Sequence, residues 1–130
     1  MHRLFGANPP AGRFREYHAQ VTAMIWDLTG KAVRSNRDVI LDFGFWTKQS
    51  RDDARVRAAS LGARVRLYSV ICDEHTILSR LRERNRSLDV ESLPIDEHGF
   101  RAVAATCEPP GPEEQAMSVE TTDDGYRVLE

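Results

Sequence analysis

Residues 39–72 read VILDFGFWTKQSRDDARVRAASLGARVRLYSVIC, and the patterns within this stretch decide the predicted fold. Residues 39–43 form an apolar run broken only by Asp42, which is typical of a strand buried on both faces of a parallel sheet. Residues 64–72, RVRLYSVIC, form the second predicted strand. Between the two predicted strands, a segment rich in Ala and Arg favours a helix that ends at Gly62. A strand, a helix and a strand joined by short loops predict a right-handed βαβ unit.

The flanking sequence predicts further helices. From Phe14 to Ala32, apolar residues recur at helical spacing, so we expect a helix that ends near Ser35 and Asn36. Asparagine tolerates the left-handed conformation of a helix C-cap. Thr47 or Ser50 is suited to cap the helix that follows the first strand. The remaining predicted elements are helices over 73–84 and 94–105 and strands over 116–120 and 126–129, with a turn at 124–125.

These elements predict an α/β fold with a single domain over residues 1–130. We expect the polar segment 85–93 to form a lid-like loop and residues 113–130 to form a terminal hairpin-like segment. A length of 130 residues suits one compact domain better than two.

Composition narrows the class of protein. A formal net charge of -2 does not suggest nucleic-acid binding, because domains that bind nucleic acid are usually strongly basic. Cys72 and Cys107 show no metal-ligand spacing and no disulfide framework, so we expect reduced thiols in a cytoplasmic protein. The N-terminus lacks the apolar core of a signal peptide, and no apolar run approaches membrane-spanning length.

Asp42 is the strongest candidate for chemistry. It lies at the predicted C-terminal end of a parallel strand, the edge outside which α/β sheets bind ligands. A carboxylate there can hold a magnesium-bound water, orient a substrate hydroxyl or accept its proton. The structural alternative is an aspartate that caps the following turn.

Trp46 and Arg51 follow Asp42 closely and are candidate substrate-binding residues. The indole of Trp46 could stack on a substrate or belong to the core. Arg51 opens the next helix and could reach the same edge of the sheet. The alternative for Arg51 is a solvated helix face paired with Asp52 and Asp53, an arrangement that contributes little free energy.

Arg80, Arg84 and Arg86 belong to the densest basic cluster of the chain. Arg80 and Arg84 are spaced i, i+4 and therefore face one way, and Arg86 is expected in the loop that follows. Arginines on a closing lid can neutralise charge on a transferring phosphoryl group. The alternative is that these cations complement the dipole at the helix C-terminus.

Taken together, these residues resemble the central part of the ATP-binding P-loop kinases of the AAA-type, zeta-toxin-like group. The shared features are a strand ending in Asp42, the turn Gly44-Phe45-Trp46, an Arg51-bearing helix, a second strand, and a helix ending in Arg80-x-x-x-Arg84-Asn85. The segment EPPGPEE at 108–114 is similar to a Pro-Pro segment of that group. The resemblance covers roughly residues 1–120.

The resemblance implies a three-layer parallel sheet and transfer of the ATP γ-phosphoryl group to a small molecule, with Mg²⁺. It implies that Asp42 acts near the phosphate acceptor as base or metal-coordinating residue, and that Arg51 helps to hold the acceptor. It also implies that Arg80, Arg84 and Arg86 lie near the ATP phosphates.

One departure from the family is serious. No G-x-x-x-x-G-K-[S/T] loop, whose backbone N–H groups would cradle the phosphates, occurs in the 130 residues. In the group's usual strand order, the strand before this loop lies between the strands at 39–43 and 64–71. We therefore expect this chain alone to be inactive, to bind Mg-ATP weakly, and to self-associate or bind a partner chain through exposed sheet edges. Either the loop is encoded upstream of Met1, or the chain is an interaction module or half of a split enzyme. A weaker alternative is a toxin-like or nucleotide-end phosphotransferase.

Overall fold

The structure is a computed structural model that describes residues 13–88, 94–122 and 124–129. The chain divides into two compact units, residues 1–42 with 88–93 and residues 43–87 with 94–130. The single domain expected over 1–130 therefore stays a prediction. The predicted lid-like loop at 85–93 lies partly outside the described residues.

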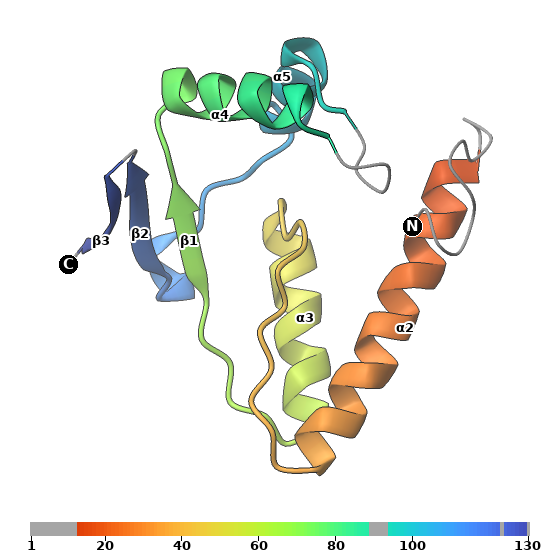
Figure 1. The fold of residues 1–130 in the computed structure, drawn as a ribbon. Coiled ribbons are helices and arrows are strands. Elements are labelled where there is room, and N and C mark those ends of the chain that lie inside the picture. Colours follow the sequence, from red (N-terminus) through yellow and green to blue (C-terminus); the bar gives the residue numbers. More distant parts are fainter. Residues whose placement is uncertain (1–12, 89–93, 123, 130) are drawn as a thin grey trace. The chain divides into compact units, whose positions relative to one another are not determined.

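Helix α2, Phe14–Arg34, is the main element of the first unit (Figure 1). It ends as the sequence predicts, because Asn36 adopts φ 55° just after the C-cap Ser35. The Asn36 N–H donates to the carbonyl of Val33 and the Arg37 N–H to that of Ala32. This pair of hydrogen bonds is the Schellman motif, which satisfies carbonyl groups that the helix end would leave unpaired.

The strand predicted over residues 39–43 is wrong for the structure of this chain. The segment has no ladder partner among the described residues, and Ile40 is 92% exposed. A strand is stabilised by hydrogen bonds to a neighbour, and an apolar sequence alone does not supply that neighbour. The predicted βαβ unit over 39–72 is therefore not formed.

A sheet of three strands, in the order β1-β2-β3, belongs to the second unit (Figure 1). Strand β1, Tyr68–Ile71, pairs in parallel with β2, Met117–Thr122. Strand β3, Gly125–Leu129, pairs antiparallel with β2, so the hairpin predicted for the C-terminal segment is confirmed. The strand predicted over 64–72 is shorter than expected. The sheet combines parallel and antiparallel pairing, and the chain has a mixed α/β fold.

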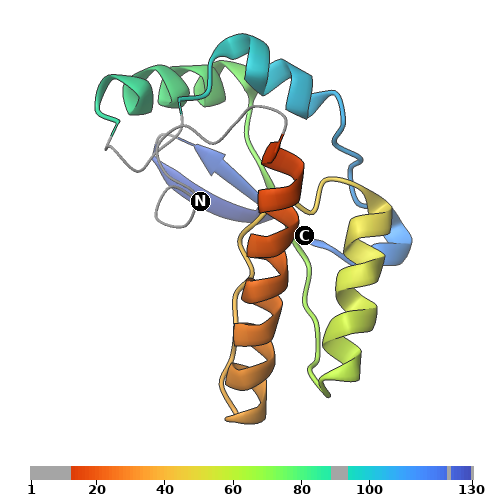
Figure 2. The ribbon, with the colours of Figure 1, turned by 90° about the vertical axis from the view of Figure 1, so that its right-hand side faces the viewer.

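In the described part of the second unit, one helix precedes the first strand of this sheet, and two helices and a short 3-10 turn lie between its first and second strands. Helix α3, Lys48–Ser60, has Leu61 as its C-cap and is followed by Gly62, where φ is 77°. Helix α4, Glu74–Arg86, follows β1, and α5, Glu97–Ala104, lies beside α4 in both views (Figures 1 and 2). The turn η2, Pro112–Glu114, leads into β2. The sequence predicted that Arg86 lies in the loop after this helix. Because α4 continues to Arg86, that residue instead lies in the last helical turn.

Few apolar side chains of the described residues are buried. Trp26 is 6% exposed, whereas Val56 is 72% and Val70 is 66% exposed. The expectation of strands buried on both faces is therefore not met in this chain. Among the described residues, no helix combines the length and the apolar character that crossing a membrane requires.

Candidate functional site

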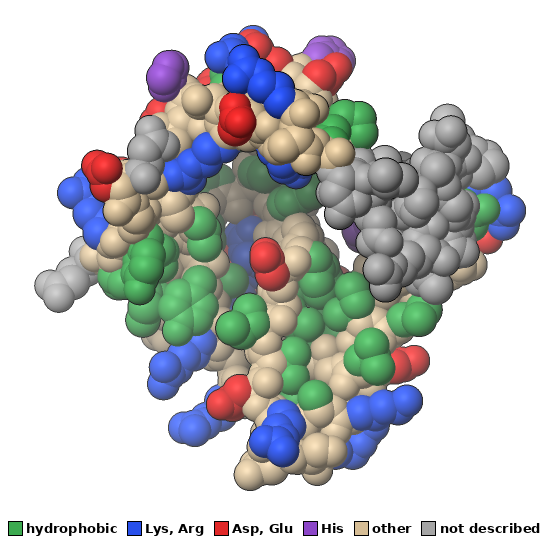
Figure 3. Space-filling model, viewed as in Figure 1, with side chains coloured by type: hydrophobic (Ala, Val, Ile, Leu, Met, Phe, Trp, Pro, Cys, Tyr) green, Lys and Arg blue, Asp and Glu red, His purple; other side chains and the backbone are tan. Residues whose placement is uncertain are grey.

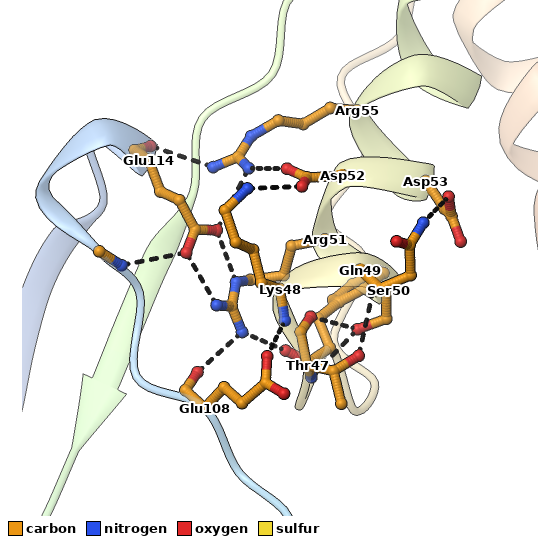
Figure 4. A network of polar contacts seen from close by, with 12 residues as sticks. Thr47, Lys48, Gln49, Ser50, Arg51, Asp52, Asp53, Arg55, Glu108 and Glu114 are labelled. Atoms are coloured by element: carbon orange, nitrogen blue, oxygen red, sulfur yellow. Dashed lines mark hydrogen bonds and ion pairs between the residues drawn. The ribbon is translucent and has the colours of Figure 1, made fainter.

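Arg51 is the centre of a buried polar network in the second unit (Figure 4). Its side chain is 5% exposed and forms a bidentate ion pair with Glu114, through Nε to Oε2 at 2.7 Å and Nη2 to Oε1 at 2.8 Å. Nη1 donates to the carbonyl of Phe45 at 3.1 Å and to that of Glu108 at 2.9 Å. One guanidinium thus holds together the turn after Asp42, helix α3 and the segment that precedes β2.

Glu114 is fully supplied with hydrogen-bond donors. Besides Arg51, it accepts from the Gly111 N–H at 3.0 Å and from Arg55 Nη1 at 3.2 Å. Hydrogen bonds to Arg51 lower the pKa of the Glu114 carboxyl to about 2, because donors favour its charged form. The pair is therefore charged throughout the physiological pH range, and neither partner is left buried and uncompensated.

The start of helix α3 is fixed by two side chains that accept from its free N–H groups. Thr47 Oγ1 accepts from the Ser50 N–H at 3.2 Å, and Ser50 Oγ accepts from the Thr47 N–H at 3.3 Å, as in a capping box. The Glu108 carboxylate accepts from the Lys48 N–H at 2.7 Å. Glu108 also donates its N–H to the carbonyl of Trp46 at 2.7 Å. The turn that carries Trp46 is therefore held from both sides.

Trp46 is 48% exposed, so it does not belong to the core of this chain. Its indole lies against Gly44, where an added Cβ atom would come within 2.4 Å of the ring. Only glycine leaves room for the indole in this position. The rings of Phe43 and Phe45 lie with their centroids 4.6 Å apart on the same turn. This segment therefore presents a half-exposed aromatic surface on a well-anchored turn.

Asp42 is the last residue of the first unit, and its side chain is exposed. It makes no hydrogen bond or ion pair with other residues that the structure describes. The alternative that Asp42 caps the following turn therefore finds no support in these contacts.

The arginines of α4 differ in their surroundings. Arg80 donates to Thr121 Oγ1 at 3.2 Å and to the carbonyl of Thr122, which ties α4 to the end of β2. Arg86 forms an exposed ion pair with Glu83 at 3.1 Å. Arg84 lies on the exposed surface of the last turn of α4. At the end of the same helix, the Asn85 side chain donates to the Ile95 carbonyl at 2.7 Å and joins α4 to the segment before α5.

The predicted site residues are thus only partly brought together. Arg51 contacts the turn of Trp46 through the Phe45 carbonyl, whereas no described contact links Arg51 with Arg80, Arg84 or Arg86. Two residues of the network, Glu108 and Glu114, were not singled out from the sequence. The sequence feature that could have indicated them is the segment EPPGPEE at 108–114. Its prolines and glycine favour a turn, and its acidic residues favour cationic partners.

The described residues do not form a complete site for Mg-ATP. No group of three or more His, Cys, Asp or Glu residues in the described part of the chain is placed to hold a metal ion. The guanidinium of Arg80 already donates hydrogen bonds to two oxygen atoms of β2. A shallow apolar depression of about 360 Å³ is lined by Pro94, Ile95, Asp96, Gly99 and Val103, none of which is a predicted site residue.

The fold and the site define a mixed α/β domain with a parallel strand pair and a cationic helix after its first strand. A family model described as an AAA domain matches residues 1–110, and the chain belongs to this family of P-loop, kinase-like nucleotide-binding domains. No curated protein and no solved structure matches the chain significantly.

Proposed function

We propose that this chain carries the acceptor side of a P-loop kinase that transfers the ATP γ-phosphoryl group to a small molecule. The observation that carries the proposal is the AAA-domain match over residues 1–110, which includes Asp42, Arg51 and the arginines of α4. The likeness of these residues to the zeta-toxin-like group supports the finer assignment. In the complete fold, the extended segment 39–43 and β1 belong to one parallel sheet of a three-layer domain.

In this proposal Asp42 accepts the proton of the acceptor hydroxyl or orients that hydroxyl for attack. Its exposure supports the role, because a general base must be reached by its substrate. Asp42 also has no competing partner among the residues that the structure describes, so its carboxylate is available to a ligand.

Trp46 and Arg51 serve the acceptor in different ways. The half-exposed indole of Trp46 offers a flat surface on which an acceptor can stack. Four N–H groups of Arg51 are engaged by Glu114 and by two carbonyl groups, so Arg51 acts through the turn that it holds. Direct contact of Arg51 with the acceptor would require the network to open.

The arginines of α4 belong to the nucleotide side. Arg84 and Arg86 are exposed near the end of α4, and a guanidinium is well suited to phosphate oxygens. Arg80 would have to exchange its contacts with β2 for phosphate contacts. Because the 130 residues contain no G-x-x-x-x-G-K-[S/T] loop, the chain by itself holds only part of a nucleotide site.

The Asp42 role is tested by Asp42→Asn in the protein supplied with a phosphate loop, whether encoded upstream or donated by a partner chain. Asparagine keeps the size of the side chain but cannot accept the proton, so we expect phosphoryl transfer to fall by about 100-fold or more. ATP binding should be unchanged. Asp38→Asn, at an exposed aspartate just before the extended segment 39–43, is the matched control and should remain active. An active Asp42→Asn protein would remove Asp42 from the mechanism.

A second candidate function is a non-enzymatic interaction module or half of a split enzyme. It is favoured by the exposed apolar side chains of β1, of which Val70 is 66% and Tyr68 is 51% exposed. The coding sequence upstream of Met1 separates the two candidates. An in-frame stretch with a Gly-rich loop ending in Gly-Lys-Ser or Gly-Lys-Thr supports the kinase, whereas an immediate in-frame stop codon supports the module or the split enzyme.

A further inference from the structure

The two peptide groups that flank Trp46 are both fixed by hydrogen bonds. In the peptide group before it, the Phe45 carbonyl accepts from Arg51 Nη1 at 3.1 Å. In the peptide group after it, the Trp46 carbonyl accepts from the Glu108 N–H at 2.7 Å. Because peptide groups are planar, fixing both of them also fixes φ and ψ of Trp46, and with them the direction of its Cα–Cβ bond.

Glu108 contributes to this arrangement with all three of its polar groups. Its N–H donates to the Trp46 carbonyl. Its carbonyl accepts from Arg51 Nη1 at 2.9 Å, and its carboxylate accepts from the Lys48 N–H at 2.7 Å (Figure 4). The Lys48 N–H is the first of helix α3, where the helix itself offers no acceptor and its positive end favours a carboxylate. Glu108 thus binds the chain on both sides of Thr47, directly after Trp46.

The indole of Trp46 is confined as well as its backbone. It lies against Gly44, where a Cβ atom would come within 2.4 Å of the ring. Exposure by itself does not distinguish Trp46, because Figure 3 shows hydrophobic side chains on the surface over the region of the strands, and Val70 is 66% exposed. Trp46 differs in that its 48% exposed side chain is carried on a backbone fixed at both ends. A surface that is fixed before a ligand arrives loses little conformational freedom on binding.

We propose that Glu108 is a positioning residue that sets the place of the Trp46 indole. The step from this position to the acceptor rests on the proposed function, in which the acceptor stacks on the indole. Glu108 acts through the Trp46 carbonyl and the start of α3. Its side chain is exposed, so its removal takes away one surface hydrogen bond and leaves the buried pair of Arg51 and Glu114 in place.

Fluorine NMR of the chain labelled with fluorotryptophan tests the position directly, because the chain contains two tryptophans and each gives its own signal. Trp46→Phe assigns the two signals. We expect Glu108→Ala to shift the Trp46 signal and to leave that of Trp26, on helix α2, unchanged. A general loss of structure would move both signals. Gly44→Ala should also shift the Trp46 signal, because the added Cβ atom displaces the indole.

Two further variants separate positioning from a general effect of substitution. Glu108→Gln keeps an oxygen that can accept from the Lys48 N–H, so its Trp46 signal should stay near that of the unchanged chain. Glu113→Ala, at an exposed glutamate of the same segment, is the matched control and should shift neither signal. A Trp46 signal that Glu108→Ala leaves in place overturns the proposal, and so does an equal shift in Glu108→Ala and Glu108→Gln.

The consequence for the acceptor is tested separately, in the phosphoryl-transfer assay described for Asp42→Asn. Glu108→Ala should raise the KM for the acceptor about fivefold, the scale of a single hydrogen bond, and should leave kcat and the KM for Mg-ATP unchanged. An unchanged KM for the acceptor overturns the link from Glu108 to the acceptor. An assay in which even the unchanged protein transfers no phosphate would instead contradict the proposed function, while the fluorine signals still decide the place of Trp46.

Discussion

Arg51 shows how one side chain can hold together parts of the chain that are far apart in sequence. Its guanidinium joins the Phe45 carbonyl of the turn after Asp42 to the Glu108 carbonyl and the Glu114 carboxylate of the segment before β2. The local sequence could not reveal this pairing, because Arg51 and Glu114 are 63 residues apart. Sequence reasoning placed Arg51 correctly at the start of its helix, but the choice between substrate and structural partner depended on this long-range contact.

We predict that Arg51→Met destabilises the chain by about 3 kcal/mol, because it leaves the Glu114 carboxylate buried without its main partner. The free energy of unfolding in denaturant measures the effect. Lys48→Met is the matched control, since Lys48 pairs with Asp52 at the exposed surface of the same helix and should change stability far less. Equal effects of the two substitutions would contradict the central position of Arg51.

The stability of the chain should also fall in acid because of Glu114. Its pKa is about 2 in the folded chain and is lowered from 4.5, so the folded state binds fewer protons than the unfolded state between these values. The stabilisation is complete above about pH 4.5 and is lost as the pH falls towards 2. Asp52 and Asp73, whose pKa values are also lowered by hydrogen bonds, act in the same direction.

Denaturant unfolding between pH 6 and pH 3, in about half-unit steps, measures this dependence. In Glu114→Gln the unfolding free energy should depend less steeply on pH than in the unchanged chain. The slope that remains comes from the other carboxyl groups. A slope that Glu114→Gln leaves unchanged would show that another group carries the acid sensitivity.

At the scale of the element, helices and strands differed in how well the sequence predicted them. The ends of α2, α3 and α4 are fixed by residues close in sequence, such as Asn36, Thr47 and Asp73. The sequence therefore predicted these ends to within a few residues. The strand at 39–43 was not formed, because a strand also needs a partner from elsewhere in the chain. The hairpin at the C-terminus did form, since its two strands are neighbours in sequence.

The C-terminal ends of α2 and α3 lead to a prediction at this scale. At the end of α3 the Gly62 N–H donates to the Ala59 carbonyl and the Ala63 N–H to that of Ala58, which is the Schellman pattern also seen at the end of α2. Gly62 has φ 77° and open space where a Cβ atom would lie, so Gly62→Ala introduces backbone strain without a steric clash. We expect a loss of about 1 kcal/mol in unfolding free energy. Asn36→Gly, at φ 55°, relieves the corresponding strain at the end of α2 and should be neutral or stabilising. A stabilising Gly62→Ala would contradict this account of the α3 end.

At the scale of the whole molecule, two observations concern the pairing of extended segments. The segment 39–43 is extended and has no ladder partner among the described residues, and β1 has one open edge. The AAA-domain match covers residues 1–110, which include both the segment 39–43 and β1. The proposed function assigns the segment 39–43 and β1 to one parallel sheet.

Calorimetric titration of the 130-residue chain with Mg-ATP tests this account most directly. The chain retains Asp42 and the arginines of α4 but contains no loop of backbone N–H groups for the phosphates. We therefore predict a dissociation constant of about 1 mM or weaker, which corresponds to a binding free energy of about -4 kcal/mol. A micromolar or tighter dissociation constant would contradict the account, because it would require a phosphate cradle that the proposed division of the site does not provide.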